Sequence, residues 1–455
     1  MTRRSVALFI GACVLGTGLA AAPTPTAAQV SSPAAPTLTL DAALQQTLTR
    51  NPQVAAAQQA VVAAQQNITV VRAGLAPSLS ANGTGSFGTS SATSFTTSSG
   101  LVTPLQNVAG TGTVSLSANM LLYDGGRIKA NVASAEAALV SAQSALRKTT
   151  QDTTLAVATA FFSVLQAERL TTVQQAVLAQ AQVQLALSQA RARAGVAAQS
   201  DVIQAQAQVA LAQVNLLQAQ SQIATSKANL QAAIGVEAST PVEVQAPPSP
   251  QLAVAISADA AMQAAETNRP EVAQAHAAVA SDQAALDLAH ITAGPQVNLG
   301  VGATYSPIST SPVLNNAVSY GLNGTVSLPI YDAGKGRAEI AAAQATLNSA
   351  QAQLNAARLT ARQDAYQAYL TAVQGAANVT ATAVAQAAAE EALRVAEGRY
   401  SAGVGTIVEV ITAQATAAQS EVNAANAVYN YQTALATLQH AQGNPIQAGT
   451  LGGGQ

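Results

Sequence analysis

Four segments of the chain alternate between apolar and polar residues. From residue 113 to residue 120 the even positions hold Val, Leu, Ala and Met, and the odd positions hold Thr, Ser and Asn. A period of two puts successive side chains on opposite faces of a strand, so the pattern predicts β-strands with one apolar and one polar face. We place these strands at about 78–87, 111–122, 296–305 and 320–331.

Two long segments carry the repeat of an α-helical coiled coil. Ile128, Val132 and Leu139 open a run of apolar residues every three or four positions, and Ile340 opens a second run. No helix-breaking residue interrupts the pattern from about Gly126 to Ala194, so one helix of roughly 100 Å is predicted. A return segment follows with one apolar residue per heptad, at Val202, Val209, Leu216, Ile223 and Leu230. The pattern predicts antiparallel coiled coils joined by tight turns, or more simply a solvated helical bundle.

The two sets of elements indicate an internal tandem repeat. Tyr123-Asp124 recurs 208 positions later as Tyr331-Asp332, and Pro52 recurs 218 positions later as Pro270. The spacing changes because the first copy carries a longer Gly/Ser/Thr-rich loop around 90–110. The predicted organisation is a first repeat at 39–235 with its tip near 195–201, a Pro-rich linker at 236–256, a second repeat at 257–443 with its tip near 403–409, and a flexible tail at 444–455.

The N-terminus has the composition of a secretory signal. Arg3 and Arg4 precede an apolar run, and small residues end at Ala28. We predict a signal peptide at 1–28 and a flexible lead-in at 29–38. The one cysteine of the chain, Cys13, lies in the apolar run and leaves an alternative open, cleavage as a lipoprotein. Net charge is −2, which does not favour nucleic acid as a partner.

Export favours strands that cross a membrane over a half-buried hairpin in a soluble sheet. Segments of about ten residues match tilted transmembrane strands with a wet inner face. Four strands are too few to close a barrel, and open edges are not tolerated in lipid. Several protomers are therefore expected to share one barrel.

The quoted motifs carry a family resemblance. The segments LYDGGR, IYDAGKGR, LTLDAALQQTLTRNPQV, ARAGVAAQSDV and RYSAGVGTIVEV resemble the TolC-type outer-membrane channel family of efflux pumps and type I secretion systems. The resemblance covers nearly the whole mature chain. It implies an α+β membrane protein in the outer membrane of a Gram-negative bacterium, a homotrimer with a twelve-stranded β-barrel continued by a helical tunnel in the periplasm.

The resemblance also implies partners and roles. A periplasmic adaptor would join the channel to an inner-membrane transporter of the RND, ABC or MFS type. The adaptor would contact the hairpin tips. The barrel would turn into the tunnel at two glycine-containing turns, where aspartates cap the helices. The tip residues are Ala194, Gly195, Val196, Ala402, Gly403 and Val404, and the turn residues are Asp124, Gly125, Gly126, Asp332 and Gly334.

The same family pattern places gating residues at the tips. The family has two acidic residues at the periplasmic aperture, and the corresponding positions in this sequence are Glu409 and Thr412. One carboxylate per protomer therefore remains. Tyr400, Ser200 and Asp201 match the closed-state contacts, whereas Gly405 stands where the family has an arginine, so the entrance is expected to open more easily. The simpler interpretation is turn chemistry, in which glycines end helices and acidic residues favour the next helix start.

Nothing in the sequence indicates an enzyme. His276, His290 and His440 lie far apart without companions at metal-ligand spacing, and no nucleophile, base and orienting group come together. We expect no cofactor. The main alternative to a channel is a trimeric coiled-coil structural or adhesive surface protein.

Overall fold

The computed structural model describes residues 37–91, 106–196, 198–238, 242–248, 252–292, 294–310 and 313–446. The predicted signal peptide with Cys13, most of the lead-in and most of the tail lie outside these residues. Within them, no helix is both long and apolar enough to span a membrane.

The N-terminal half (residues 39–235) and the C-terminal half (residues 257–443) show the same order of elements. Each has two helices, two strands, a 67-residue helix and a return helix. The first set is α1 (Leu40–Arg50), α2 (Pro52–Arg72), the 3-10 helix η1 (Ala73–Leu75), β2 (Ser78–Ser91), β3 (Gln106–Tyr123), α3 (Arg127–Arg193) and α4 (Gln199–Ile234). The second set is α5 (Ala258–Asn268), α6 (Pro270–Ile291), β5 (Gln296–Thr310), β6 (Val313–Ser327), α7 (Lys335–Ser401) and α8 (Ile407–Ala441).

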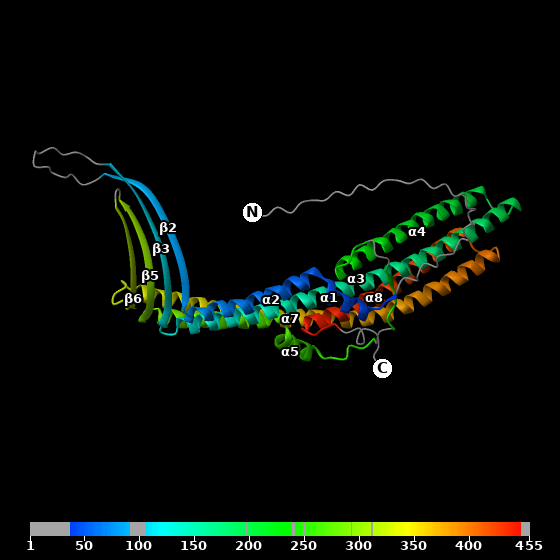
Figure 1. The fold of residues 1–455 in the computed structure, drawn as a ribbon. Helices are drawn as coiled ribbons and strands as arrows, with labels where there is room; N and C mark the ends of the chain where they lie inside the picture. The colour runs from blue at the N-terminus through cyan, green and yellow to red at the C-terminus, as the bar shows by residue number, and fades with distance from the viewer. Residues whose placement is uncertain are drawn as a thin grey trace, which may run out of the picture. The chain divides into compact units, whose positions relative to one another are not determined.

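The long strands form one antiparallel sheet in the order β2-β3-β5-β6 (Figure 1). Register puts Leu116 opposite Ala81 on one side and Ala303 on the other, and Ala303 opposite Tyr320. The apolar positions of all four strands therefore share one face. The opposite face is polar, and the hydroxyls of Ser80 and Ser117 lie 2.9 Å apart there.

The strand limits differ from those predicted. β2, β3 and β5 extend past the predicted 87, 111 and 305, because backbone pairing continues where the alternation fades. β6 starts earlier, at Val313, and ends at Ser327 instead of 331. Its last partner is Gln296 at the start of β5, and Pro329 has no N–H to donate to a neighbour. The exposed residues 328–331 thus lack a strand partner in this protomer.

Parts of the predicted linker, lead-in and tail contact the rest of the protein. Thr37 and Leu38 form β1 (Thr37–Leu38), which pairs in parallel with β4 (Glu243–Val244) inside the predicted linker. Ile446, at the start of the predicted tail, is buried against the core. These segments are held because apolar side chains join the cluster around Phe161 and Leu230.

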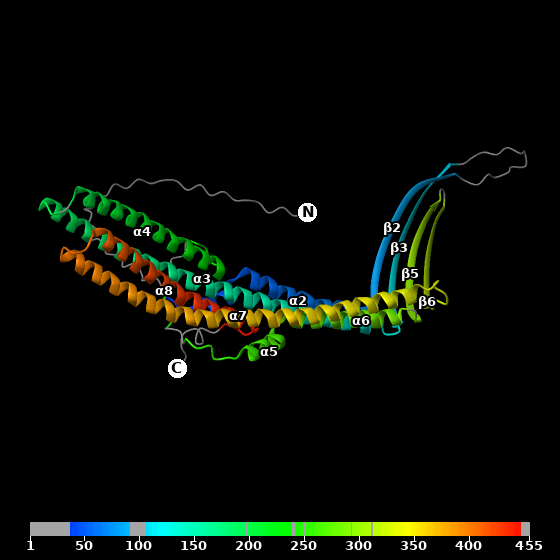
Figure 2. The same cartoon turned by 180° about the vertical axis from the view of Figure 1, so that it is seen from behind.

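The two long hairpins, α3 with α4 and α7 with α8, pack side by side through α3 and α8. α3 contacts both α4 and α8, and α8 contacts α7, which gives the order α4-α3-α8-α7 (Figures 1 and 2). The predicted hairpins are present, but their seam differs in depth. Val209, Leu216 and Ile223 are only half-buried, whereas Ala205, Ala212 and Ala219 between them are fully buried. Val202 and Leu230, at the two ends of the predicted seam, are buried as well, so alanines replace the larger residues as the deepest side chains only along its middle.

Candidate functional site: the tips of the helical hairpins

Both hairpins turn through the same backbone motif. At the first tip, Val196 N–H donates to the Arg191 carbonyl and Gly195 N–H to the Ala192 carbonyl. Gly195 adopts a φ of +72°. This pair of bonds is a Schellman ending, in which a left-handed residue satisfies the last carbonyls of a helix. Gly195 therefore ends α3 and sends the chain back.

The second tip repeats this geometry and adds a cap. Gly403, with a φ of +78°, ends α7, and the N–H of Val404 bonds to the Arg399 carbonyl. The hydroxyl of Thr406 then accepts the N–H of Glu409 at 3.3 Å and starts α8. The simpler interpretation of the glycines as helix ends thus describes both turns.

Tyr400 connects the two tips. It is buried with Ile407 and Val410 at the base of the second tip. The guanidinium of Arg191, from the first tip, lies 4.1 Å from the centre of the Tyr400 ring and donates to its carbonyl oxygen at 3.0 Å. A cation over an aromatic ring is attracted by the negative face of the ring. Arg191 therefore joins α3 to α7.

The predicted aperture residues lie on an exposed polar line of α8. Glu409, Thr412 and Thr416 follow one another along the helix, and Gln419 and Asn423 continue the line. The Thr412 hydroxyl donates to the Val408 carbonyl at 2.8 Å. A shallow groove beside Glu409 and Thr412 is bounded by alanines of α7. The line presents hydrogen-bonding groups and one carboxylate to water.

Glu409 has a cation as a neighbour. Its carboxylate lies 3.5 Å from Arg399 Nη1, and both side chains are about half exposed. An exposed pair of this length contributes little to stability. It does partly neutralise the carboxylate that the sequence singles out.

Ser200 and Asp201 lie together in the first turn of α4. The Ser200 hydroxyl donates to the Asp201 carboxylate at 3.4 Å. Among the described residues no hydrogen bond joins Tyr400 to Asp201. The gating role of these three residues stays a prediction.

The turns between strand and long helix share one local design. Asp124 accepts the N–H groups of Gly126 and Ile128, and Asp332 accepts those of Gly334 and Gly336. Gly125, Gly126 and Gly334 all have positive φ. These aspartates satisfy backbone donors that a helix start leaves free. The backbone N–H groups of Gly336 and Gly334 lower the pKa of Asp332.

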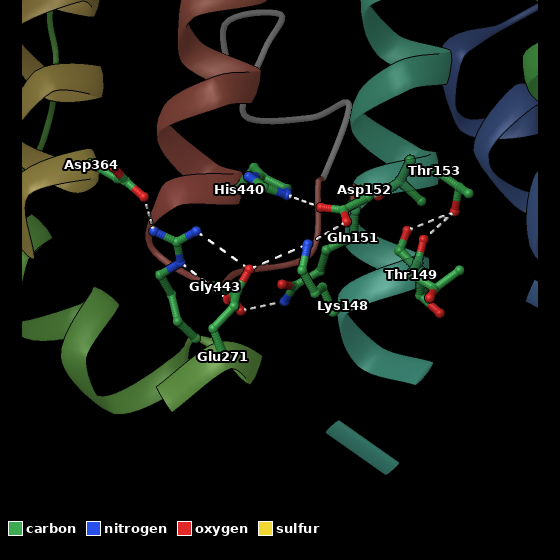
Figure 3. A network of polar contacts seen from close by, with 12 residues as sticks. Lys148, Thr149, Gln151, Asp152, Thr153, Glu271, Asp364, His440 and Gly443 are labelled. Carbon is green, nitrogen blue, oxygen red and sulfur yellow. Dashed lines mark hydrogen bonds and ion pairs between the residues drawn. The ribbon is translucent and has the colours of Figure 1, made fainter. Parts of the chain in front are cut away.

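A cluster of charges ties four helices together far along the chain from the tips (Figure 3). Lys148 contacts Asp152 at 2.7 Å and Glu271 at 3.5 Å, and His440 Nε2 lies 2.7 Å from Asp152. Arg269 binds both Glu271 and Asp364. We call this the central ion cluster, made of Lys148, Asp152, Arg269, Glu271, Asp364 and His440.

The cluster shifts the protonation of its own members. Burial raises the pKa of Asp152, but hydrogen bonds from Lys148 and His440 outweigh it and hold that pKa below the ordinary value. Burial also raises the pKa of Glu271, which its own backbone N–H and Arg269 bring down below the ordinary value. The hydrogen bond to Asp152 raises the pKa of Lys148. All three side chains are therefore held in their charged forms.

Sequence reasoning missed Arg191, Arg399 and the central ion cluster. It looked for a tip arginine at Gly405 only, although Arg191 in the last turn of α3 reaches Tyr400 from the other tip. The one available signal was the basic residue at each helix end.

Comparison with known proteins gives a family. The sequence model described as Outer membrane efflux protein matches residues 43–236 and 261–444. Protein CyaE of Bordetella pertussis is 28% identical over 299 residues, which are 64% of this chain and 62% of CyaE. Nodulation protein T of Rhizobium leguminosarum bv. trifolii is 24% identical over 410 residues, 89% of this chain and 85% of that protein.

Solved structures share the fold. A membrane protein from Pseudomonas aeruginosa superposes with a TM-score of 0.75 at 22% identity, covering 89% of this chain and 90% of that one. The outer membrane protein VceC from Vibrio cholerae gives 0.71 at 20% identity, covering 90% and 97%. The resemblance to TolC-type channels is confirmed. Because the family model matches most of its length, this chain belongs to the outer membrane efflux protein family and is an outer-membrane protein that extends into the periplasm.

Proposed function

We propose that this protein is the outer-membrane exit duct of a tripartite efflux pump or type I secretion system. A periplasmic adaptor and an inner-membrane transporter of the RND, ABC or MFS type deliver the substrate, and the duct conducts it passively to the outside. The transporter supplies the energy and selects the cargo. The duct carries out no reaction and holds no cofactor.

The observation that carries this proposal is the direct joining of a two-faced sheet to long helical hairpins. The apolar face of the sheet is contiguous over four strands, as required of a surface that meets lipid. Its polar face meets water. Each half passes through an aspartate-capped turn straight into a 67-residue helix. One chain thus links a membrane layer to a helical periplasmic part.

The open edges support a homotrimer built from tandem repeats. Within the described residues, β2 and β6 each have a partner on one side only. Unpaired backbone groups at a sheet edge are not tolerated in lipid, so the edges must meet other copies. Three protomers with four strands each give the twelve-stranded barrel that the family resemblance implies.

The tips supply the entrance and the adaptor contacts. Val196 and Val404 are exposed at the two turns, which suits apolar contact with an adaptor. Around a threefold axis, Glu409 side chains form one anionic ring that favours cations, and Tyr400, Ser200 and Asp201 adjust its opening. Thr412, whose hydroxyl bonds to its own helix, adds no second charge.

Single-channel conductance of the outer-membrane-extracted protein in a planar bilayer tests this proposal. The wild type is expected to give a small, cation-preferring conductance, and Glu409→Ala should lose the preference. Thr412→Ala is the matched control on the same polar line and should retain it. A correctly assembled protein without conductance would rule out the duct.

A further inference from the structure

Basic residues gather at the end of the sheet where the strands join the helices (Figure 1). The four long strands carry no charged residue, and residues 73–126 and 270–334 hold neither Lys nor Arg. The first turn of each long helix then brings two cations, after which residues 130–146 and 338–357 again hold none. We call these four residues the basic collar: Arg127, Lys129, Lys335 and Arg337.

The stability of the two long helices does not explain the collar. A cation at the start of a helix opposes the helix dipole, which favours negative charge there. The first turns of α1, α4, α5, α6 and α8 each hold an acidic residue, whereas those of α3 and α7 hold none. Asp124 and Asp332 lie just before these turns, but their carboxylates accept backbone N–H groups.

Two members of the collar project into solvent without a salt bridge. Arg127 donates to the carbonyl at the end of α6, and the Lys335 ammonium lies 3.5 Å from the Glu339 carboxylate. Lys129 and Arg337 occupy matching positions, 208 residues apart, and both are exposed. Among the residues that the structure describes, neither of the two forms a salt bridge. They are therefore available to an anion outside the chain.

Lys129 and Arg337 lie on the outer face of the proposed duct. Arg147 follows Lys129 by five helical turns and donates to a backbone carbonyl at the end of α5. Arg362 follows Arg337 by about seven turns and pairs with an acidic residue of α5. Helix α5 thus packs on the face of α3 and α7 that carries the two cations. Because a helix packed inside a duct would obstruct it, this face is the outer one.

An exposed tyrosine precedes each pair of cations. A register shift at the end of β3 sets Tyr123 opposite Val297, on the apolar face of the sheet. Tyr123 is 54% exposed, and Tyr331 at the matching position is 88% exposed. Tyrosines favour the boundary of a membrane, where the ring lies in the apolar layer and the hydroxyl meets water. Lys129 and Arg337 follow these tyrosines across one tight turn, on the side of the headgroups.

We propose that the basic collar binds the headgroups of anionic phospholipids in the periplasmic leaflet of the outer membrane. This rests on the duct proposed above, because it takes the apolar face of the sheet to lie in lipid. Lys129 and Arg337 contact the headgroup phosphates, and Arg127 and Lys335 add to the positive potential beside them. Cations next to a membrane surface attract anionic lipids in this way. The collar also sets the depth at which the sheet sits in the membrane.

Electron paramagnetic resonance of spin-labelled lipids tests the collar in membranes that contain the reconstituted protein. The wild type is expected to hold labelled phosphatidylglycerol about two- to fivefold more strongly than labelled phosphatidylcholine at low salt. In Lys129→Gln with Arg337→Gln the two lipids should be held nearly equally, and in Lys129→Glu with Arg337→Glu the preference should reverse. Sodium chloride at about 1 M should abolish the preference of the wild type, because it shortens the screening length to about 3 Å.

Arg193→Gln with Arg394→Gln is the matched control. It removes the same charge from exposed positions near the hairpin tips and should keep the preference. An unchanged preference in the collar variants, or an equal loss in the control, overturns the collar. If lipid of either kind is still immobilised by the protein, the duct then stands. A protein that immobilises no lipid overturns both, because its sheet does not meet the membrane.

Discussion

Arg269 and Asp364 form an ion pair with 2.6 Å between Nη1 and Oδ2, which fixes the start of α6 against α7. The Arg269 side chain is 11% exposed, the lowest value in any of the ion pairs found among the described residues. The matching position in the N-terminal half is Asn51, which donates to the Ala233 carbonyl at 2.9 Å. The two halves thus hold the same junction, one with an amide and one with charges.

Arg269→Ala is expected to lower the free energy of unfolding by about 1–3 kcal/mol, because it leaves Asp364 without its counter-charge and leaves Glu271 with Lys148 alone. Denaturant unfolding of the detergent-solubilised protein measures this. Arg394→Ala is the control. Its pair with Glu391 is exposed, so we expect a change near zero. Equal effects of the two substitutions would contradict the stabilising role of the cluster.

The central ion cluster predicts sensitivity to acid. The pKa values of Asp152 and Glu271 are lowered by folding, so their contribution to stability is complete above the ordinary values of 3.8 and 4.5 and is lost as pH falls through the folded values. The thermal midpoint should fall with pH below that window. In Asp152→Asn this fall should be shallower, with a lower midpoint at neutral pH. A parallel pH profile for wild type and variant would refute the assignment.

Ala333 predicts a stabilising substitution. It is the one non-glycine residue with positive φ among the described residues, at +54°, a conformation that costs an alanine about 1–2 kcal/mol. Ala333→Gly is therefore expected to raise the free energy of unfolding by about 0.5–1 kcal/mol, after allowance for the greater freedom of glycine in the unfolded chain. Gly125→Ala should do the reverse, because of its φ of +70° and the nearby Ile291. Denaturant unfolding compares the two.

Arg399 predicts a change in ion selectivity. Arg399→Gln removes the cation 3.5 Å from Glu409, so the ratio of cation to anion permeability should rise. Reversal potentials under a salt gradient measure the ratio. Arg394→Gln, one turn farther from the tip and paired with Glu391, is the control and should leave it unchanged. An unchanged permeability ratio in Arg399→Gln would mean that Glu409 does not lie at the constriction of the channel.

The close approach of α3 and α4 limits the size of the side chain that fits at Ala212. Ala212→Leu forces a large side chain between α3 and α4 and should cost about 1–3 kcal/mol. Val214→Leu, on the exposed side of the same helix, should be nearly neutral. Denaturant unfolding distinguishes them. Equal stability of the two variants would mean that the helices do not approach closely at Ala212.

Periodicity in the sequence predicts the kinds of element and the faces they share. The alternation around Leu116 predicts a two-faced strand, and the uninterrupted run after Ile128 predicts a helix that the structure shows as 67 residues. Periodicity does not report depth. It marks Leu216 as an inward position and gives no sign of Ala212, and only the distance between the backbones decides that Ala212 is the deeper.

Contacts between segments far apart in the chain could not be predicted from the local sequence pattern. Arg191 and Tyr400 lie 209 residues apart, and Asp152 and His440 lie 288 apart, so neither pair follows from spacing along a helix. The end of β6 at Ser327 has a similar cause. Strand pairing depends on a neighbour, and the alternation through Ile330 cannot indicate whether one is present.

The buried alanines between α3 and α4 lower the side-chain entropy that is lost when the protein folds. Burying alanine gains little apolar area, but it freezes no side-chain rotamers, whereas burying methionine or glutamine costs up to about 2 kcal/mol. Ala205, Ala212 and Ala219 therefore bring no entropic penalty from side chains to the pairing of α3 with α4. Each turn of a helix pair of this composition buries little apolar area and loses little side-chain entropy. The free energy of pairing therefore depends mainly on the larger side chains packed at the two ends of the hairpin.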